Sequence, residues 1–498
     1  MSPNVYLGID HGGSTTTALA LGSAGEVLGS HSVPMPKQTP KVGWVEHDPN
    51  DFVSASRAVC EAVLHEIGRT WKQVAAVGFA NQGETCIVWS AKTGHALGPA
   101  ISWEDRRTAA LCEQLATAGV DRLIRERTGI ILEPYFSAPK YKWLIDNEPS
   151  VTEAASQSEL RLGGTDSYAI WSMTAGETHA TDAGTASRTA LFNLRTVKWD
   201  SDLLEAFNLE PSMMAEIRPT DGHFGTIKMS DDKVEIPITA NVVDCHSALF
   251  AQGCWDPTII KATYGTGAFI DLNTGSELLQ PDGLLPVFIG WDLGFGAQYM
   301  LEGGVFSVGS AIDWCVRSGW LPSAKASSDL ASSVSDSGGV TMLPCFAGLA
   351  APHWRTSARA TLIGLGLDTT PAHIAHALLD GIAFRCCEVI ESLNQRIGNR
   401  VTEVRADGGP TRNPFLMQRQ ADLLGMPVNV SLEPNMTALG AALLAAHGAG
   451  HFTLDDIRSM EVKHQVYEPA MSATERSSRW EKWQTDFEAL VNSWPSAV

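Results

Sequence analysis

Short apolar runs alternate along the chain with longer segments whose apolar residues recur at helical spacing. Short continuous apolar runs are typical of buried strands, whereas spacings of about three to four residues are typical of helices packed on one face. Strands are predicted at residues 5–10, 18–21, 74–80, 86–89 and 401–406. Helices are predicted at residues 51–68, 108–118, 371–389 and 440–449.

The first two strands enclose a short turn, and the same arrangement returns in the second half of the chain. Residues 5–10 and 18–21 form the pattern of a β-hairpin around a turn rich in glycine and hydroxyl groups. Residues 259–264 and 268–270 repeat this pattern around the turn 265–267. This weak internal repeat indicates two related domains, each with a hairpin turn that can bind phosphate.

The first turn has the side chains that a phosphate site needs. Gly12 and Gly13 leave room for an anion beside the backbone, and Ser14 and Thr15 add hydroxyl donors to its N–H groups. Asp10 ends the first strand, where a carboxylate could hold Mg²⁺ next to that anion. An ordinary glycine-rich hairpin would show the same pattern, so the rest of the chain has to decide.

Three other polar segments interrupt the apolar pattern. Residues 81–85 separate two buried strands, and residues 101–108 combine an aromatic ring with acids and bases that could line a sugar or polyol pocket. Asp244 ends an apolar stretch just before a predicted helix. Each segment also has a plain alternative: a polar turn, a solvated helix start and a helix cap.

Composition narrows the classes of protein that remain. The chain has 498 residues and a net charge of −20, which argues against binding nucleic acid or anionic membranes. No apolar run reaches the length of a membrane span, and the first strand leaves no room for a signal peptide. The nine cysteines contain no CxxC pair, so we expect reduced thiols and a cytoplasmic location.

Several long motifs occur together along the chain. They are Tyr135-x-Ser137-x-x-Lys140-Tyr141-x-Trp143-Leu144-x-Asp146-Asn147, Ala360-x-Leu362-x-Gly364-Leu365, His373-Ile374-x-x-Ala377-Leu378-Leu379-Asp380, Asn81-Gln82-x-Glu84-Thr85 and Ala186-Ser187-Arg188-Thr189. Together they resemble the FGGY family of carbohydrate kinases, and within it the glycerol kinases. The resemblance runs from residue 5 to residue 449, and the first three segments fit two long patterns of the family in register.

The resemblance implies an α/β protein with two ribonuclease H-like (actin-like ATPase) domains around a central cleft. Residues 1–253 would form the N-terminal domain, which binds the sugar or polyol, and residues 254–498 the C-terminal domain, which binds ATP. Tryptophans and other apolar residues at helical spacing from residue 480 onward predict a C-terminal docking helix. Many proteins of this family are dimers, and a homodimer is expected here by analogy alone.

The resemblance also implies roles for individual residues in ATP-dependent phosphorylation of a hydroxyl. Asp244 matches the general base and Asp10 matches the acid that organises Mg²⁺. The positions expected around the sugar or polyol are Gly83, Glu84, Trp103, Tyr135, Asp244, Cys245 and Phe269. The positions expected around ATP and its phosphates are Gly12, Gly13, Ser14, Thr15, Gly265, Thr266, Gly267, Gly309, Asp313, Gly409 and Asn413.

Two positions depart from the glycerol kinase pattern. Gly83 stands where those enzymes usually have arginine, and Cys245 stands where they usually have glutamine. The missing guanidinium and amide would remove hydrogen-bond donors and open space. One hypothesis is therefore a larger acceptor, such as a tetritol, a tetrulose or a pentulose; the other is glycerol, with water filling the gap.

Functions of other classes rest on weaker patterns. A non-catalytic, actin-like nucleotide-binding sugar sensor would share the hairpins but would not phosphorylate a small molecule. Ser137-x-x-Lys140 and Lys92-Thr93-Gly94 also occur in penicillin-binding serine hydrolases, but here their order is reversed. His373 with His376 would be a poor metal site, because histidines three apart usually lie on a helix surface.

Overall fold

The structure is a computed structural model that describes residues 4–229, 234–355 and 357–491. The chain forms two compact units. Unit 1 contains residues 1–253, 275–300 and 435–461, and unit 2 contains residues 254–274, 301–434 and 462–498. The predicted α/β class with two units is confirmed, whereas the boundary between residues 253 and 254 stays a prediction.

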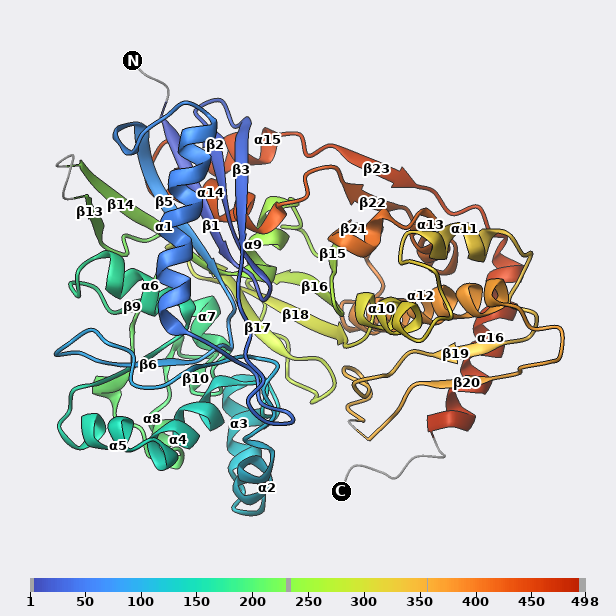
Figure 1. The fold of residues 1–498 in the computed structure, drawn as a ribbon, viewed down its shortest axis with the longest axis horizontal. Helices are drawn as coiled ribbons and strands as arrows, with labels where there is room; N and C mark the ends of the chain where they lie inside the picture. The colour runs from blue at the N-terminus through green and yellow to red at the C-terminus, as the bar shows by residue number, and fades with distance from the viewer. Residues whose placement is uncertain (1–3, 230–233, 356, 492–498) are drawn as a thin grey trace. The chain divides into compact units, whose positions relative to one another are not determined.

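Unit 1 is built on a six-stranded mixed sheet in the order β13-β14-β5-β1-β2-β3 (Figure 1). Its strands are β1 (Val5–His11), β2 (Thr15–Gly22), β3 (Val27–Pro34), β5 (Val74–Asn81), β13 (Thr226–Met229) and β14 (Val234–Val243). β1 and β2 form the predicted antiparallel hairpin, with Asp10 opposite Thr17. β1, β5 and β14 run parallel, so their carboxyl ends meet at one edge of the sheet.

Helices cover both faces of this sheet, because its central strands are apolar on both sides. α1 (Pro49–Glu66) packs on β2 and β3, and the Asp48 side chain caps its first turn by accepting a hydrogen bond from the Asn50 N–H. α14 (Met436–Gly448) packs on β1 and β5 from the other face. A Cβ atom at Gly8 would lie 1.9 Å from the Ala438 carbonyl oxygen, so the approach of this helix requires glycine.

Smaller elements of unit 1 flank the carboxyl edge of the sheet. They include β6 (Ile87–Ser90), β8 (Leu160–Gly163), β17 (Val287–Asp292), α4 (Ser137–Asn147), α5 (Pro149–Ser156), α7 (Ala183–Ser187), α8 (Ser201–Ala206) and α9 (Asp244–Ala251). β6 and β8 pair antiparallel, and α7 packs against β17 and β14. These elements place α4, α7 and α9 around the polar ends of β1, β5 and β14.

Unit 2 repeats the strand plan of unit 1, as the weak sequence repeat predicted. The seven-stranded sheet runs in the order β17-β18-β16-β15-β21-β22-β23, and its six strands from β18 to β23 repeat the plan. Their bounds are β15 (Ile259–Tyr264), β16 (Ala268–Gly275), β18 (Ala297–Val305), β21 (Glu403–Asp407), β22 (Val428–Ser431) and β23 (His464–Tyr467). β15 and β16 form an antiparallel hairpin, and β21 and β22 run parallel to β15.

Helices of unit 2 include the predicted C-terminal docking helix. α16 (Ala473–Val491) buries Trp483 and Phe487, and the Trp483 ring stacks on Phe384 of α12 (Pro371–Arg396) with their centroids 4.8 Å apart. Two shorter helices, α10 (Gly309–Arg317) and α13 (Pro414–Leu424), begin near the hairpin turn and near the end of β21. α16 therefore packs its aromatic residues against α12 of the same unit.

Two predictions from composition can be compared with the described residues. No helix among them has the length and apolar character needed to cross a membrane. All nine cysteines are free thiols, and every one except Cys245 is buried.

Candidate active site

The turn between β1 and β2 is compact, and the 81–85 segment holds it in place. Gln82 donates a hydrogen bond from Nε2 to the Gly12 carbonyl oxygen at 3.0 Å. A Cβ atom at Gly12 would lie 2.8 Å from the Thr15 carbonyl oxygen, so a side chain there would force the turn open. Neither Gly12 nor Gly13 has positive φ among the described glycines, so the turn uses glycine for space. Ser14 and Thr15 are exposed beside it.

Two carboxylates lie close together at the carboxyl edge of the sheet in unit 1. Asp10 is the penultimate residue of β1, and Asp244 begins α9 directly after β14. Burial raises the pKa of Asp10 well above its usual value, and the nearby Asp244 raises it further. Asp10 Oδ1 is buried with no hydrogen-bond partner among the described residues. A buried carboxylate oxygen of this kind fits a divalent cation, because a cation would compensate both effects.

Glu84 is held by a buried arginine from another element. Arg188, which follows α7, donates a hydrogen bond from Nη1 to Glu84 Oε1 at 2.9 Å, and only 1% of its side chain is exposed. Its guanidinium lies over the Phe288 ring of β17 at 3.9 Å from the centroid. The Glu84 carboxylate therefore has a guanidinium partner in Arg188, although Gly83 offers none.

Lys140 joins two of the predicted acceptor residues through their backbone. Its fully buried ammonium donates to the Glu84 carbonyl oxygen at 3.0 Å and to the Tyr135 carbonyl oxygen at 2.7 Å. Burial lowers the pKa of Lys140. The Ser137-x-x-Lys140 motif thus supports the site from behind, and Ser137 Oγ also faces the Glu84 carbonyl oxygen, at 3.4 Å.

Aromatic rings and polar atoms complete this side of the site. The Trp103 ring meets the Tyr135 ring edge-on, with their centroids 5.9 Å apart. The Trp103 backbone N–H donates to Thr85 Oγ1 at 3.3 Å, which ties the ring to the 81–85 segment. The Cys245 backbone N–H donates to Asp244 Oδ1 at 2.6 Å. Unit 1 therefore brings six predicted acceptor residues around one edge, namely Gly83, Glu84, Trp103, Tyr135, Asp244 and Cys245.

Unit 2 brings the predicted phosphate turn next to a helix start. The Gly309 N–H donates to the Gly265 carbonyl oxygen at 3.0 Å, and the Ser310 N–H donates to the Thr266 carbonyl oxygen at 3.1 Å. A Cβ atom at Gly309 would lie 2.6 Å from the Gly265 carbonyl oxygen. Gly267 closes the turn by accepting a hydrogen bond from the Gly265 N–H. Helix N-termini beside such turns are favourable places for phosphate.

The remaining predicted residues of unit 2 lie on nearby and separate elements. Gly409 follows β21, while Asn413 caps α13 by accepting a hydrogen bond from the Leu416 N–H at 3.0 Å. Asp313 lies exposed on α10. Phe269 lies on β16 in unit 2, whereas the other predicted acceptor residues belong to unit 1, so its role at the acceptor stays a prediction.

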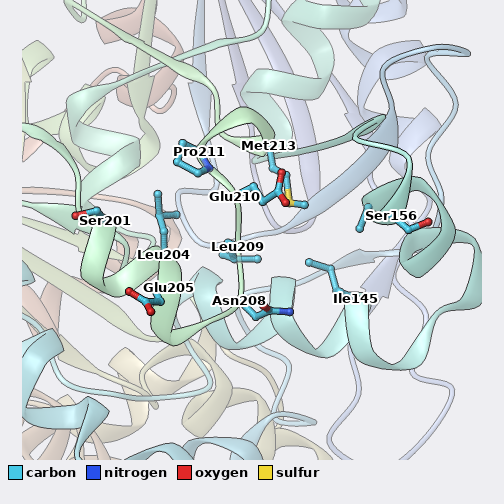
Figure 2. A pocket seen from close by; sticks show the side chains of 11 residues that line it. Ile145, Ser156, Ser201, Leu204, Glu205, Asn208, Leu209, Glu210, Pro211 and Met213 are labelled. Carbon is cyan, nitrogen blue, oxygen red and sulfur yellow. The ribbon is translucent and has the colours of Figure 1, made fainter.

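Unit 1 also has a pocket that contains none of the predicted site residues. It has a volume of about 460 Å³ and is lined by Ile145 of α4, Ser156 of α5 and Leu204 of α8, among others. Figure 2 shows these side chains around it, with Leu209 and Met213 between them. The candidate active site is therefore identified by its pair of carboxylates and not by the volume of a pocket.

Comparison with known proteins decides the family. The model for the N-terminal domain of the FGGY family of carbohydrate kinases matches residues 5–251, and the model for its C-terminal domain matches residues 260–449. The chain belongs to the FGGY family of carbohydrate kinases. The family that the sequence motifs indicated is thereby confirmed.

Individual relatives of this FGGY kinase extend over its whole length. A glycerol kinase of Pseudothermotoga lettingae is 39% identical over 97% of the chain and 98% of the relative. A glycerol kinase of Alkalilimnicola ehrlichii is 40% identical over 96% of both chains. The crystal structure of Plasmodium falciparum glycerol kinase with ADP matches with a TM-score of 0.91 at 31% identity, over 98% of both chains.

These relatives bear on the alternatives that the sequence left open. They support an enzyme that phosphorylates a polyol or sugar with ATP, and they give no support to a non-catalytic sensor or to a preference for larger acceptors. The motif that contains Lys140 does not predict its role in the site, because Lys140 acts through backbone carbonyl oxygens. The motif that contains Arg188 likewise does not predict its pairing with Glu84, because the two residues are distant in sequence.

Proposed function

We propose that this FGGY kinase transfers the γ-phosphoryl group of ATP to a hydroxyl of a small polyol of the glycerol type. The observation that carries the proposal is the pair of carboxylates, Asp10 and Asp244, at the carboxyl edge of the unit 1 sheet. Phosphoryl transfer needs one group to accept the hydroxyl proton and another to neutralise the phosphates, and two carboxylates can divide these roles. Glycerol is the first acceptor to test, because the similar proteins are glycerol kinases.

Asp244 is the general base in this proposal. It is the first residue of α9, on the same edge of the sheet as Glu84, and its Oδ1 accepts a hydrogen bond from the Cys245 N–H. The acceptor hydroxyl gives its proton to the Asp244 carboxylate as its oxygen bonds to the γ-phosphorus. The bond between that phosphorus and the oxygen bridging it to the β-phosphate breaks, and ADP leaves.

Asp10 is the residue that would hold Mg²⁺. Its buried Oδ1 and its raised pKa support this role, because the carboxylate lacks a compensating charge among the described residues. Bound Mg²⁺ would neutralise charge on the phosphates of ATP. In unit 1 the backbone of the Gly12–Thr15 turn, with the Ser14 hydroxyl, is suited to a phosphate.

The nucleotide itself is assigned to unit 2. The turn of Gly265, Thr266 and Gly267 lies against the start of α10, where N–H groups and the helix dipole favour phosphate. Gly409 and Asn413 mark a second helix start after β21, with Asp313 on α10 as a further candidate. A cytoplasmic location, a homodimer and the absence of nucleic-acid binding remain predictions.

The proposal is tested by measuring ADP release from Mg²⁺-ATP with a panel of acceptors. The panel contains glycerol, dihydroxyacetone, erythritol and xylulose, with acceptor-free protein as the blank. We expect release that depends on a polyol and saturates with it, led by glycerol. Release that no acceptor stimulates would refute the proposed function.

A further inference from the structure

Arg188 is an almost completely buried charged side chain beside the predicted acceptor residues. It follows α7, whose first turn is capped by Asp182, and its side chain is 1% exposed. Asp182 accepts hydrogen bonds from the N–H groups of Gly184 and Thr185, which fixes the start of this short helix. The Asp182 cap therefore fixes the helix that precedes Arg188, independently of the contacts that the Arg188 side chain makes.

The guanidinium joins three residues that line the site. Nη1 donates to Glu84 Oε1 at 2.9 Å, while Nη2 donates to Cys245 Sγ at 3.0 Å and to His246 Nε2 at 2.9 Å. Its plane lies over the Phe288 ring at 3.9 Å. A rigid planar donor stacked on a ring holds its partners in fixed directions, which a lysine cannot do.

Gly83 gives this arginine the room it uses. A Cβ atom at Gly83 would lie 3.0 Å from Arg188 Cγ, 3.3 Å from Arg188 Cδ and 3.1 Å from Val243 Cγ1. The volume beside residue 83 is thus filled by the methylene groups of Arg188. The departures at Gly83 and Cys245 meet at this one side chain, since Arg188 packs on the first and donates to the second.

The charged residues around the predicted acceptor site indicate the class of acceptor. Arg188 and Glu84 form a buried pair that is neutral overall. The nearby Lys140 ammonium is fully buried and is bound by the carbonyl oxygens of Glu84 and Tyr135. Asp10 and Asp244 add negative charge nearby. A carboxylate can accept about four hydrogen bonds, so Glu84 can accept hydrogen bonds from acceptor hydroxyls in addition to the one from Arg188. This arrangement of charges favours an uncharged polyol over a sugar acid.

We propose that Arg188 is a positioning residue that sets acceptor specificity, by holding the Glu84 carboxylate and the Cys245 thiol in place for an uncharged polyol. This inference rests on the proposed function. Arg188 acts through Glu84 and Cys245, so its loss should change the binding of the acceptor more than the binding of ATP.

The test compares wild type, Arg188→Met and Arg188→Lys in the ADP-release assay, with glycerol as acceptor. For Arg188→Met we expect the acceptor KM to rise at least tenfold, while the KM for ATP stays within about twofold. Arg188→Lys should recover part of the loss, because a lysine keeps the charge but not the fork.

A matched control separates positioning from general damage. Arg385 of unit 2 is 2% exposed, pairs with Glu388 and lies over the Phe487 ring, so Arg385→Met removes a similar buried arginine. We expect Arg385→Met to lower stability without changing the acceptor KM. If Arg188→Met fails to fold, Arg188→Lys alone must still raise the acceptor KM.

Several outcomes would overturn the inference. An unchanged acceptor KM in both Arg188 variants would do so, as would an equal rise in the acceptor KM of Arg385→Met. Turnover of glycerate as fast as that of glycerol by the wild type would contradict the charge argument. If wild type shows no polyol-dependent turnover, the proposed function fails and this inference fails with it, whereas normal wild-type turnover with unaltered variants rejects the inference alone.

Discussion

Lys140 offers a stability test whose size follows from its two hydrogen bonds. The substitution Lys140→Met keeps the length of the side chain but removes the ammonium that donates to the carbonyl oxygens of Glu84 and Tyr135. Hydrogen bonds from charged groups contribute about 1.5–3 kcal/mol each, or about 3–6 kcal/mol for the pair. Burial of the ammonium opposes this, as the lowered pKa of Lys140 shows. We expect a net loss of about 2–4 kcal/mol in the free energy of unfolding.

The same helix provides a control for this measurement. Lys142 is partly exposed on α4 and pairs with the exposed Asp146 at 2.9 Å, one turn away. Exposed pairs of this spacing contribute about 0.3–0.5 kcal/mol, so Lys142→Met should lose little. Both variants would be unfolded in guanidinium chloride and followed by tryptophan fluorescence. The slope of the free energy of unfolding against denaturant concentration would be compared with that of wild type.

Activity gives a second measure of the same substitution. Lys140 fixes the backbone of two predicted acceptor residues, so Lys140→Met should raise the acceptor KM more than Lys142→Met does. The reasoning would be refuted if Lys140→Met lost no more stability than Lys142→Met. An acceptor KM equal to that of wild type would refute the link between Lys140 and the site.

The remaining predictions concern packing, pH and the metal. Gly8→Ala should lower the free energy of unfolding by at least about 1–3 kcal/mol, because the new Cβ would meet the Ala438 carbonyl oxygen; denaturant unfolding measures it, and wild-type stability would contradict it. Burial raises the pKa of Asp182 to about 6, so its protonated form stabilises the fold below pH 4 and this contribution is lost as the pH rises to 6. Asp182→Asn should therefore gain up to about 3 kcal/mol relative to wild type between pH 4 and 7, and a pH-independent difference would contradict this. Asp10→Asn should raise the Mg²⁺ concentration for half-maximal turnover at least tenfold, and an unchanged Mg²⁺ titration would exclude Asp10 as the metal residue.

Local pattern was enough to predict most elements near the site. The hairpin around Gly12, the strand that carries Asp10 near its end and the helix that starts at Asp244 follow from short-range signals of glycine, hydroxyl and apolar spacing. The repeat of that hairpin in unit 2 was visible for the same reason. Parallel strands then bring the two aspartates together, because their carboxyl ends share an edge.

Features that depend on distant partners could not be predicted in this way. The small-residue pattern of α14 predicts close packing but does not say that the helix covers β1, which lies at the other end of the chain. Gly83 suggested an empty space because the sequence does not reveal that Arg188 fills it. Both cases involve side chains or backbones that meet only in the folded unit, so spacing along the chain carries no signal of them.

The most direct test of the central claim is to identify the product. Protein, Mg²⁺-ATP and ¹³C-labelled glycerol would be incubated and followed by ³¹P and ¹³C NMR, with Asp244→Asn in parallel. We predict a new phosphate monoester on a glycerol carbon with wild type, and a loss of at least a thousandfold in its rate of formation with Asp244→Asn, whose nucleotide binding should persist. ADP and inorganic phosphate without a phosphorylated polyol, or equal product from Asp244→Asn, would contradict the account.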